Sequence, residues 1–156
     1  MMRIRMIVVG RTRAPFIREG ESFYLKRLRR YSQADRVAVK AARITKGKPD
    51  ADILAREEDS ITRKIRDRDY VICLDRKGKT RNSRDLAAHL DRLSLLGRPV
   101  SFVIGGPLGL SENLLKRADE RLSLSKMTLT HEMSRLMLLE QLYRAFTILR
   151  NEKYHK

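Results

Sequence analysis

The chain alternates short apolar runs rich in β-branched residues with segments of helical period, and this alternation limits the folds open to it. The apolar runs are nearly continuous, as in strands that are buried on both faces. Strands separated by helices are typical of a mainly parallel sheet. We therefore predict an α/β fold with a mainly parallel sheet and helices on both faces, formed as a single domain over residues 1–156. The expected strands are Ile4–Gly10, Asp35–Ala41, Tyr70–Asp75 and Pro99–Gly106, and the expected helices cover about residues 15–31, 51–65, 83–96, a short stretch after Ser111, and 132–150.

The charge of the chain indicates an anionic partner. There are 35 Lys and Arg residues against 19 Asp and Glu residues, which gives a formal net charge of +16. Because such an excess repels itself unless a polyanion compensates it, nucleic acid is the first partner to expect and an anionic membrane surface the second. No segment reaches the roughly 20 apolar residues of a membrane span, so we expect a cytoplasmic protein without membrane attachment. The basic runs suited to phosphate contacts are Leu25–Tyr31, Thr62–Arg68 and Arg76–Arg84.

Cysteine and histidine give no sign of a metal site. The only cysteine, Cys73, lies in the apolar run YVICLD, where we expect a buried and unreactive thiol. The three histidines are His89, His131 and His155, and their spacing matches no metal-binding pattern, so we expect no bound metal. His89 falls within a predicted helix, where we expect it to face solvent.

The most unusual stretch is GGPLGLS, which follows the fourth expected strand. It lacks the GxGxxG spacing of a dinucleotide fold and the Lys-Ser/Thr ending of a phosphate loop, which disfavours a pyrophosphate ligand. Gly105 and Gly106 would let a flat ligand approach the main chain. Gly109 would supply a positive φ before Ser111 caps the next helix. Taken alone, the stretch is better explained as an ordinary glycine turn between strand and helix than as a ligand-binding loop.

A second unusual stretch, LSLSKMTLTHEM, leads into the last helix. Leu122, Leu124, Met127 and Leu129 would form an apolar wall, and the main-chain groups of Leu124–Leu129 would hydrogen-bond the edge of an adenine. The alternative is a short edge strand packed on the core.

The last helix has two apolar stripes, which suggests that one meets the domain and the other a second copy of the protein. The alternative is full burial within one chain. Glu140 and Arg144 have the spacing of a simple surface ion pair. Beyond the helix, Tyr154, His155 and Lys156 offer stacking, proton exchange and phosphate pairing, unless the tail is a frayed end. The stripes occupy positions 136, 139, 143 and 146 and positions 138, 142, 145 and 149.

Taken in order and spacing, VSFVIGGPLGLS, LSLSKMTLTHEMSRLMLLEQLYRAF and the terminal YHK resemble the ribosomal RNA large subunit methyltransferase H family of the SPOUT class. The resemblance extends over the whole chain through VVGRTR, KGKPDADI and ICLDRKGK. It implies methylation of N3 of a pseudouridine in a stem-loop of 23S ribosomal RNA, S-adenosylmethionine as methyl donor, a homodimer, and a deep trefoil knot near the C-terminus. The chain has Thr130, His131 and Glu132 where the family commonly has Pro-His-Gln, a departure that bears on the geometry of the cofactor loop.

The resemblance also implies roles for particular residues. Our own mechanistic hypothesis for the implied reaction is that Arg144 and His155 favour loss of the imide proton of the pseudouridine and that Tyr154 stacks on or orients the base, from the opposite subunit of the dimer. The residues implied to bind the cofactor are Leu74, Gly105, Gly106, Leu124, Ser125, Lys126, Met127, Thr128 and Leu129.

Two other functions compete with this hypothesis. A non-enzymatic RNA-binding assembly factor would explain the charge but not the two unusual stretches, and it would release no heat when titrated with S-adenosylmethionine. A nucleotide-dependent enzyme of ordinary Rossmann type is weakened by the missing glycine fingerprint.

Overall fold

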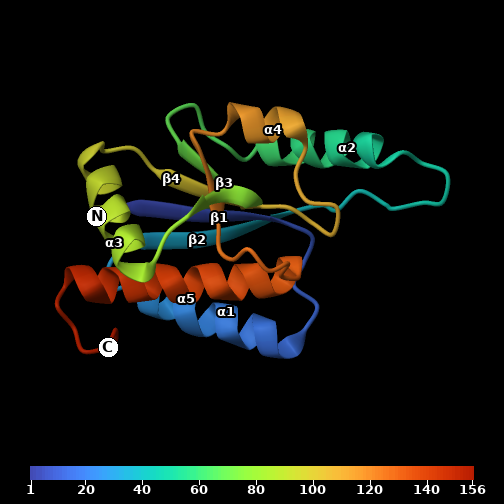
Figure 1. Ribbon diagram of the computed structural model, residues 1–156. Helices are drawn as coiled ribbons and strands as arrows, with labels where there is room; N and C mark the ends of the chain where they lie inside the picture. The colour runs from blue at the N-terminus through green and yellow to red at the C-terminus, as the bar shows by residue number, and fades with distance from the viewer.

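Five parallel strands and five helices make up the fold in the computed structural model, which describes residues 1–156 (Figure 1). The strands form one sheet in the order β2-β1-β4-β3-β5, and every neighbouring pair is parallel. The predicted α/β class and parallel sheet are therefore confirmed. The elements are β1 (Arg3–Val9), α1 (Pro15–Leu28), β2 (Gln33–Val39), α2 (Asp50–Thr62), β3 (Tyr70–Thr80), α3 (Ser83–Leu95), β4 (Val100–Ile104), α4 (Glu112–Arg117), β5 (Glu120–Ser123) and α5 (His131–Leu149).

Helices cover both faces of the sheet, as predicted. Helices α1, α3 and α5 pack on one face, and α2 and α4 pack on the other (Figure 1). Alternate residues of β1 pack on opposite faces of the sheet, with Met6 and Val8 in the larger core and Ile7 and Val9 in the smaller one. This double burial is the reason that the central strands are nearly continuous apolar runs.

The edge strand β5 pairs with β3 in an irregular way. Leu74 and Lys79 of β3 both pair with Leu122 of β5, so residues 75–78 bulge out between them. A Cβ at Gly78 would lie within 3.0 Å of main-chain atoms of Arg121 and Leu122, so only glycine fits this close approach. The expected strand ended at Asp75, and the structure extends it by this second pairing.

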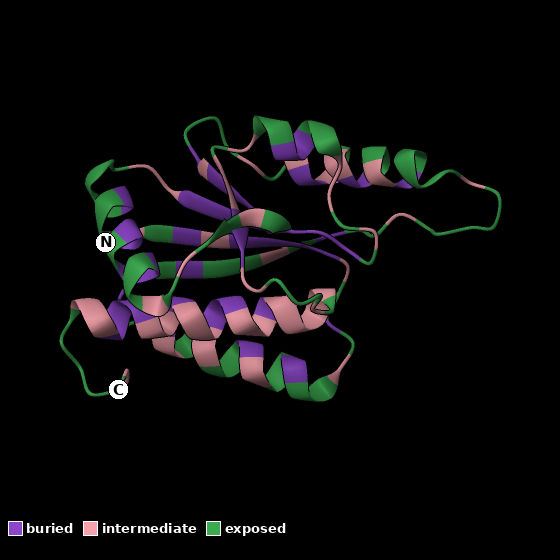
Figure 2. Cartoon of the chain, in the orientation of Figure 1, coloured by how far each residue is buried: buried purple, intermediate pink, exposed green.

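Helix α5 lies between α1 and α3, and each of its residues is at least partly buried (Figure 2). Leu138, Leu142 and Ala145 belong to the larger core. The other stripe meets α1, where Leu136 packs on Gly20 and the ring of Tyr143 lies 6.0 Å from that of Tyr24. The single chain therefore covers most of both stripes, and the stripes alone do not indicate a second copy.

His89 does not face solvent, and that prediction is wrong. Its side chain is buried against β5, with Nε2 2.5 Å from Oε2 of Glu120. The other carboxylate oxygen of Glu120 accepts hydrogen bonds from Arg81 at 3.1 and 3.2 Å. The helix periodicity could not reveal this partner, because Glu120 reaches His89 only through the pairing of β5 with β3.

Cys73 is fully buried, as predicted. Burial raises the pKa of its thiol to about 12, which keeps it protonated and unreactive at neutral pH. None of the helices has the length and hydropathy required to span a bilayer.

Candidate functional site

A cavity of about 750 Å³ lies beyond the carboxyl ends of β3 and β4. Ligands of open α/β sheets bind at this edge, because the loops that follow the strands gather there. The glycine loop after β4, the segment after β5 and the first turn of α5 all contribute to it. The cavity is lined by Leu74, Asp75, Arg76, Ile104, Gly105, Gly106, Pro107, Leu108, Gly109, Leu122, Leu124, Ser125, Met127, Thr128, Leu129, Thr130, His131 and Ser134.

Eight of the nine predicted cofactor residues therefore lie at one cavity, although they come from three separate segments. The ninth, Lys126, is exposed and does not line it. Met127 was expected in an apolar wall, but 77% of it is exposed, so it forms the rim of the cavity.

The glycine loop is a tight turn that folds back on itself. A Cβ at Gly105 would lie within 3.0 Å of main-chain atoms of Gly109, so this position excludes every other residue. The predicted positive φ at Gly109 is confirmed at +79°, and Ser111 caps α4 by accepting a hydrogen bond from the N–H of Leu114 at 3.2 Å. The close contact at Gly105 is therefore made within the glycine loop itself.

The segment from Leu124 to Leu129 is held by side chains. None of its main-chain N–H and C=O groups pairs with another main-chain group. Instead, Ser125 Oγ accepts from the N–H of Met127 at 3.0 Å, and Arg76 donates to Oγ1 of Thr128 at 2.8 Å. Because most of its main-chain groups are left unpaired, the segment can offer donors and acceptors to a bound ligand.

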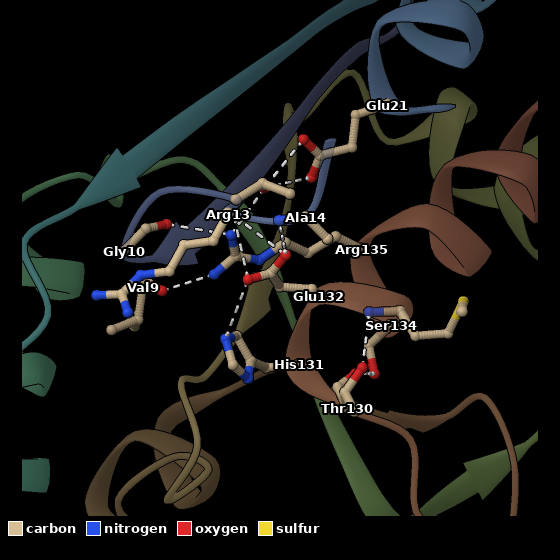
Figure 3. A network of polar contacts seen from close by, with 12 residues as sticks. Val9, Gly10, Arg13, Ala14, Glu21, Thr130, His131, Glu132, Ser134 and Arg135 are labelled. Carbon is tan, nitrogen blue, oxygen red and sulfur yellow. Dashed lines mark hydrogen bonds and ion pairs between the residues drawn. The ribbon is translucent and has the colours of Figure 1, made fainter. Parts of the chain in front are cut away.

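A buried arginine fixes the first turn of α5 to the sheet (Figure 3). Arg135 is fully buried, and it donates hydrogen bonds to the carbonyl groups of Val9, the last residue of β1, at 2.6 Å and of Gly10 at 3.1 Å. It also donates to Oγ1 of Thr12 at 3.0 Å, and Thr12 donates in turn to the carboxylate of Glu21. Burial lowers the pKa of Arg135, and the charge of Glu21 opposes this shift.

Glu132 joins α5 to the start of α1 (Figure 3). Its Oε1 accepts from the N–H of Ala14 at 3.0 Å and from that of Arg13 at 3.1 Å. Helix α1 has no capping side chain of its own, so Glu132 supplies the cap. Thr130 caps α5 itself by accepting from the N–H of Met133 at 3.1 Å, so the entry to the helix is fixed by a hydroxyl group.

His131 lines the cavity next to this network, and sequence reasoning did not select it. Its partial burial lowers the pKa of the imidazole, and the charge of Arg135 adds to the effect. The ring is therefore neutral at pH 7. In the sequence, the only indication of a place at the cavity was that His131 directly follows LSLSKMTLT.

The predicted catalytic residues form a second cluster at the other end of α5. Arg144 donates to Oε1 of Glu140 at 2.7 and 3.2 Å, which confirms the ion pair expected from the spacing and raises the pKa of Arg144. Nη1 of Arg144 lies 3.3 Å from Nδ1 of His155, and the hydroxyl of Tyr154 donates to Oε1 of Glu140 at 3.0 Å. The tail is thus folded back on the helix and is not a frayed end. Burial raises the pKa of Tyr154, as do its hydrogen bonds to Tyr24 and Glu140.

The cavity and this cluster do not meet within one chain. Ser134 lines the cavity, whereas Arg144 follows ten positions later on the same helix, a rise of about 15 Å. The two groups of predicted residues are therefore separate sites in the isolated chain.

We expect Gly105→Ala to lower the free energy of unfolding by about 2 kcal/mol, because the new methyl group would overlap the main chain of Gly109. Urea unfolding measures the change. Gly106→Ala is the matched control, since its Cβ would approach only side chains, that of Val9 at 3.3 Å and that of Glu57 at 3.8 Å. Equal losses in the two variants would contradict this account of the turn.

We expect part of the acid sensitivity of the protein to depend on Glu132. The hydrogen bonds from the N–H groups of Ala14 and then Arg13 hold the pKa of Glu132 below its usual 4.5. Its ionised form therefore stabilises the fold above about pH 4.5, and this contribution disappears as the pH falls through the lower folded-state value. Unfolding measured from pH 7 to pH 3 should show a smaller stability loss in Glu132→Gln than in the unchanged chain. Parallel pH profiles would refute the assignment.

Comparison with known proteins places these features in a family. Residues 2–155 match the family model described as "Predicted SPOUT methyltransferase". Proteins named ribosomal RNA large subunit methyltransferase H from Exiguobacterium sp. and Bacillus thuringiensis are 41% and 42% identical, over 99% of this chain and 100% of each relative. A probable methylase family protein of known structure from Haemophilus influenzae shares the fold, with a TM-score of 0.56 and 16% identity over 99% of this chain and 71% of its own. The protein belongs to the SPOUT methyltransferase family.

Proposed function

We propose that this protein transfers a methyl group from S-adenosylmethionine to N3 of a pseudouridine in 23S ribosomal RNA of the large subunit. The names of its full-length relatives support a ribosomal RNA substrate. The observation that carries the proposal is the cavity beyond β3 and β4, where three sequence segments bring together eight of the residues assigned to the methyl donor.

The cavity suits the adenosine part of the methyl donor. Its volume of about 750 Å³ is that of a small-molecule site, and Leu122, Leu124 and Leu129 give it apolar walls. The unpaired main-chain groups of Leu124–Leu129 match the donors and acceptors on the edge of an adenine. When bound, S-adenosylmethionine supplies an electrophilic methyl group, and the glycine turn and the segment after β5 hold the donor in place.

The residues of the second cluster act on the pseudouridine. Methyl transfer needs the nucleophile aligned with the methyl carbon, and N3 must lose its imide proton. Arg144 is positively charged at neutral pH and favours the anionic base. His155, in contact with Arg144, is placed to accept the proton, and Tyr154 orients the base.

The distance between the two sites supports a homodimer, in which the cluster of one subunit completes the cavity of the other. Helix α1 offers a surface for this contact. Phe16 and Phe23 lie two turns apart on it and are 63% and 47% exposed. Covering these rings with a second copy would remove apolar surface from water.

A deep trefoil knot near the C-terminus belongs to the same proposal. The double pairing of Leu122 with Leu74 and Lys79, and the close approach of Gly78 to Arg121, bring two main-chain segments into the contact that such threading requires. The whole of residues 1–156 then acts as one domain, in the cytoplasm where ribosomal RNA is made.

We expect Arg144→Ala and His155→Ala each to lower turnover by about 100-fold or more, because each removes a group that assists proton loss. Affinity for S-adenosylmethionine should change little, since neither residue lines the cavity of its own chain, where the donor is held. Transfer of a labelled methyl group to ribosomal RNA and calorimetry with the donor measure the two effects. Lys153→Ala is the control, because Lys153 is exposed and outside the cluster. A variant with unchanged turnover would remove that residue from the mechanism.

A mixing experiment tests the shared site. Thr128→Trp should block the cavity, and Arg144→Ala should disable the cluster, so neither variant should be active alone. After subunit exchange in an equal mixture, half of the dimers would be mixed, and activity should return to about a quarter of that of the unchanged protein. An inactive mixture would show that cavity and cluster must belong to one chain.

A further inference from the structure

A second hollow region, which we call the arginine groove, lies at the end of the sheet where the strands begin. It consists of two adjoining cavities of about 490 and 1020 Å³ beside the first residues of β1, β2 and β4. The length of the sheet separates it from the cavity beyond β3 and β4. The arginines that line it are Arg3, Arg5, Arg29, Arg66, Arg68, Arg98 and Arg150, and the acidic residues are Asp35, Asp67, Asp69 and Asp91.

Five of these arginines have structural roles. Arg3 donates to Oε1 of Gln33 at 3.0 Å. Arg5 donates two hydrogen bonds to Asp35, at 3.1 and 3.2 Å, and Arg98 donates to the main-chain carbonyl groups of residues 68 and 69. Arg29 and Arg150 are the C-terminal caps of α1 and α5, where a positive charge complements the helix dipole. The fold itself therefore accounts for these five charges.

Arg66 and Arg68 are different. Both are exposed, and neither side chain makes a hydrogen bond or an ion pair. Helix α2 ends at Thr62, so its dipole does not explain them either. Packing and folding thus leave these two charges available to a partner.

The turn that carries Arg66 and Arg68 is rigidly held. The side chain of Asp69 accepts from the N–H of Arg66 at 3.0 Å and from Oγ of Ser101 at 2.8 Å. The N–H of Asp69 donates to the carbonyl of Arg66 at 3.0 Å, and Arg98 donates to that of Arg68 at 3.0 Å. Ser101 belongs to β4, so the sheet itself fixes the turn. The main chain that carries these two charges is therefore ordered before binding, and only the arginine side chains remain to be immobilised.

We propose that the arginine groove binds backbone phosphates of RNA, as a contact surface at the end of the sheet opposite to the cavity of the same chain. Guanidinium groups match phosphate geometry, and a groove follows a nucleic-acid backbone better than it fits a flat lipid surface. The proposal rests on the ribosomal RNA substrate proposed above. The groove also includes Phe146, Leu149 and Arg150, so it lies beside the end of α5 that carries the cluster around Arg144.

The test is the salt dependence of RNA binding by Arg66→Ala/Arg68→Ala. We expect the slope of log affinity against log salt concentration to fall in magnitude by about two, one for each lost phosphate contact. The probe is a fluorescent transcript of a complete domain of large-subunit ribosomal RNA, bound to the full-length protein. Lys46→Ala/Lys48→Ala is the matched control, because it removes the same charge from the exposed loop before α2.

A slope unchanged from that of the original protein, or an equal change in the lysine control, would overturn the proposal. So would unchanged RNA binding together with reduced binding to vesicles of anionic lipid. Methyl transfer is measured separately in the same preparations. A protein that binds RNA through these arginines but transfers no methyl group would refute the proposed activity while supporting the groove.

Discussion

The buried guanidinium of Arg135 is the interaction on which the rest of the site depends. It joins the first turn of α5 to the carbonyl groups at and beyond the end of β1, and Glu132 joins the same turn to the start of α1. An arginine buried in this way cannot give up its acceptors without a large desolvation cost, so the helix cannot slide along the sheet. Because His131 and Ser134 occupy the same turn, this constraint also sets one wall of the cavity.

The other walls of the cavity are fixed by different means. The glycine turn is positioned by steric contact within the loop, because Gly105 has no room for a side chain. The segment after β5 is positioned by its hydroxyl side chains, which leaves most of its main-chain polar groups unpaired. A pocket with rigid walls and unpaired backbone groups recognises a ligand by main-chain hydrogen bonds, and such recognition depends little on which side chains occupy the segment.

The sequence predicted those parts of the fold that follow from local pattern. The central strands were predicted because both faces of the sheet are covered, so that residues such as Ile7 and Val103 belong to continuous apolar runs. The turn at Gly109 and Ser111 was predicted from the glycine, which adopts a positive φ, and from the serine, which caps the next helix. Strand β5 was predicted only in part, as the short edge strand that was the alternative for the stretch from Leu122. It begins two residues earlier, with Glu120 and Arg121, whose charges are satisfied only after Arg81, His89 and Asp75 come near. The sequence did not predict the folded tail either, because it depends on the hydrogen bond between Tyr31 and Glu152, which are far apart in the sequence. The catalytic assignments came from the family resemblance and not from local pattern.

The cluster around Arg144 is organised before any substrate arrives. One carboxylate oxygen of Glu140 accepts from both Arg144 and Tyr154, while the other accepts from Gln141 at 2.8 Å. Such a network costs no reorganisation at the moment of reaction, which is how polar groups contribute most to stabilising a developing charge. It also holds the tail in place, so His155 has a defined position although it is the penultimate residue. In the proposed dimer, docking two rigid surfaces is then sufficient to assemble a complete site, and no part of the chain needs to fold anew.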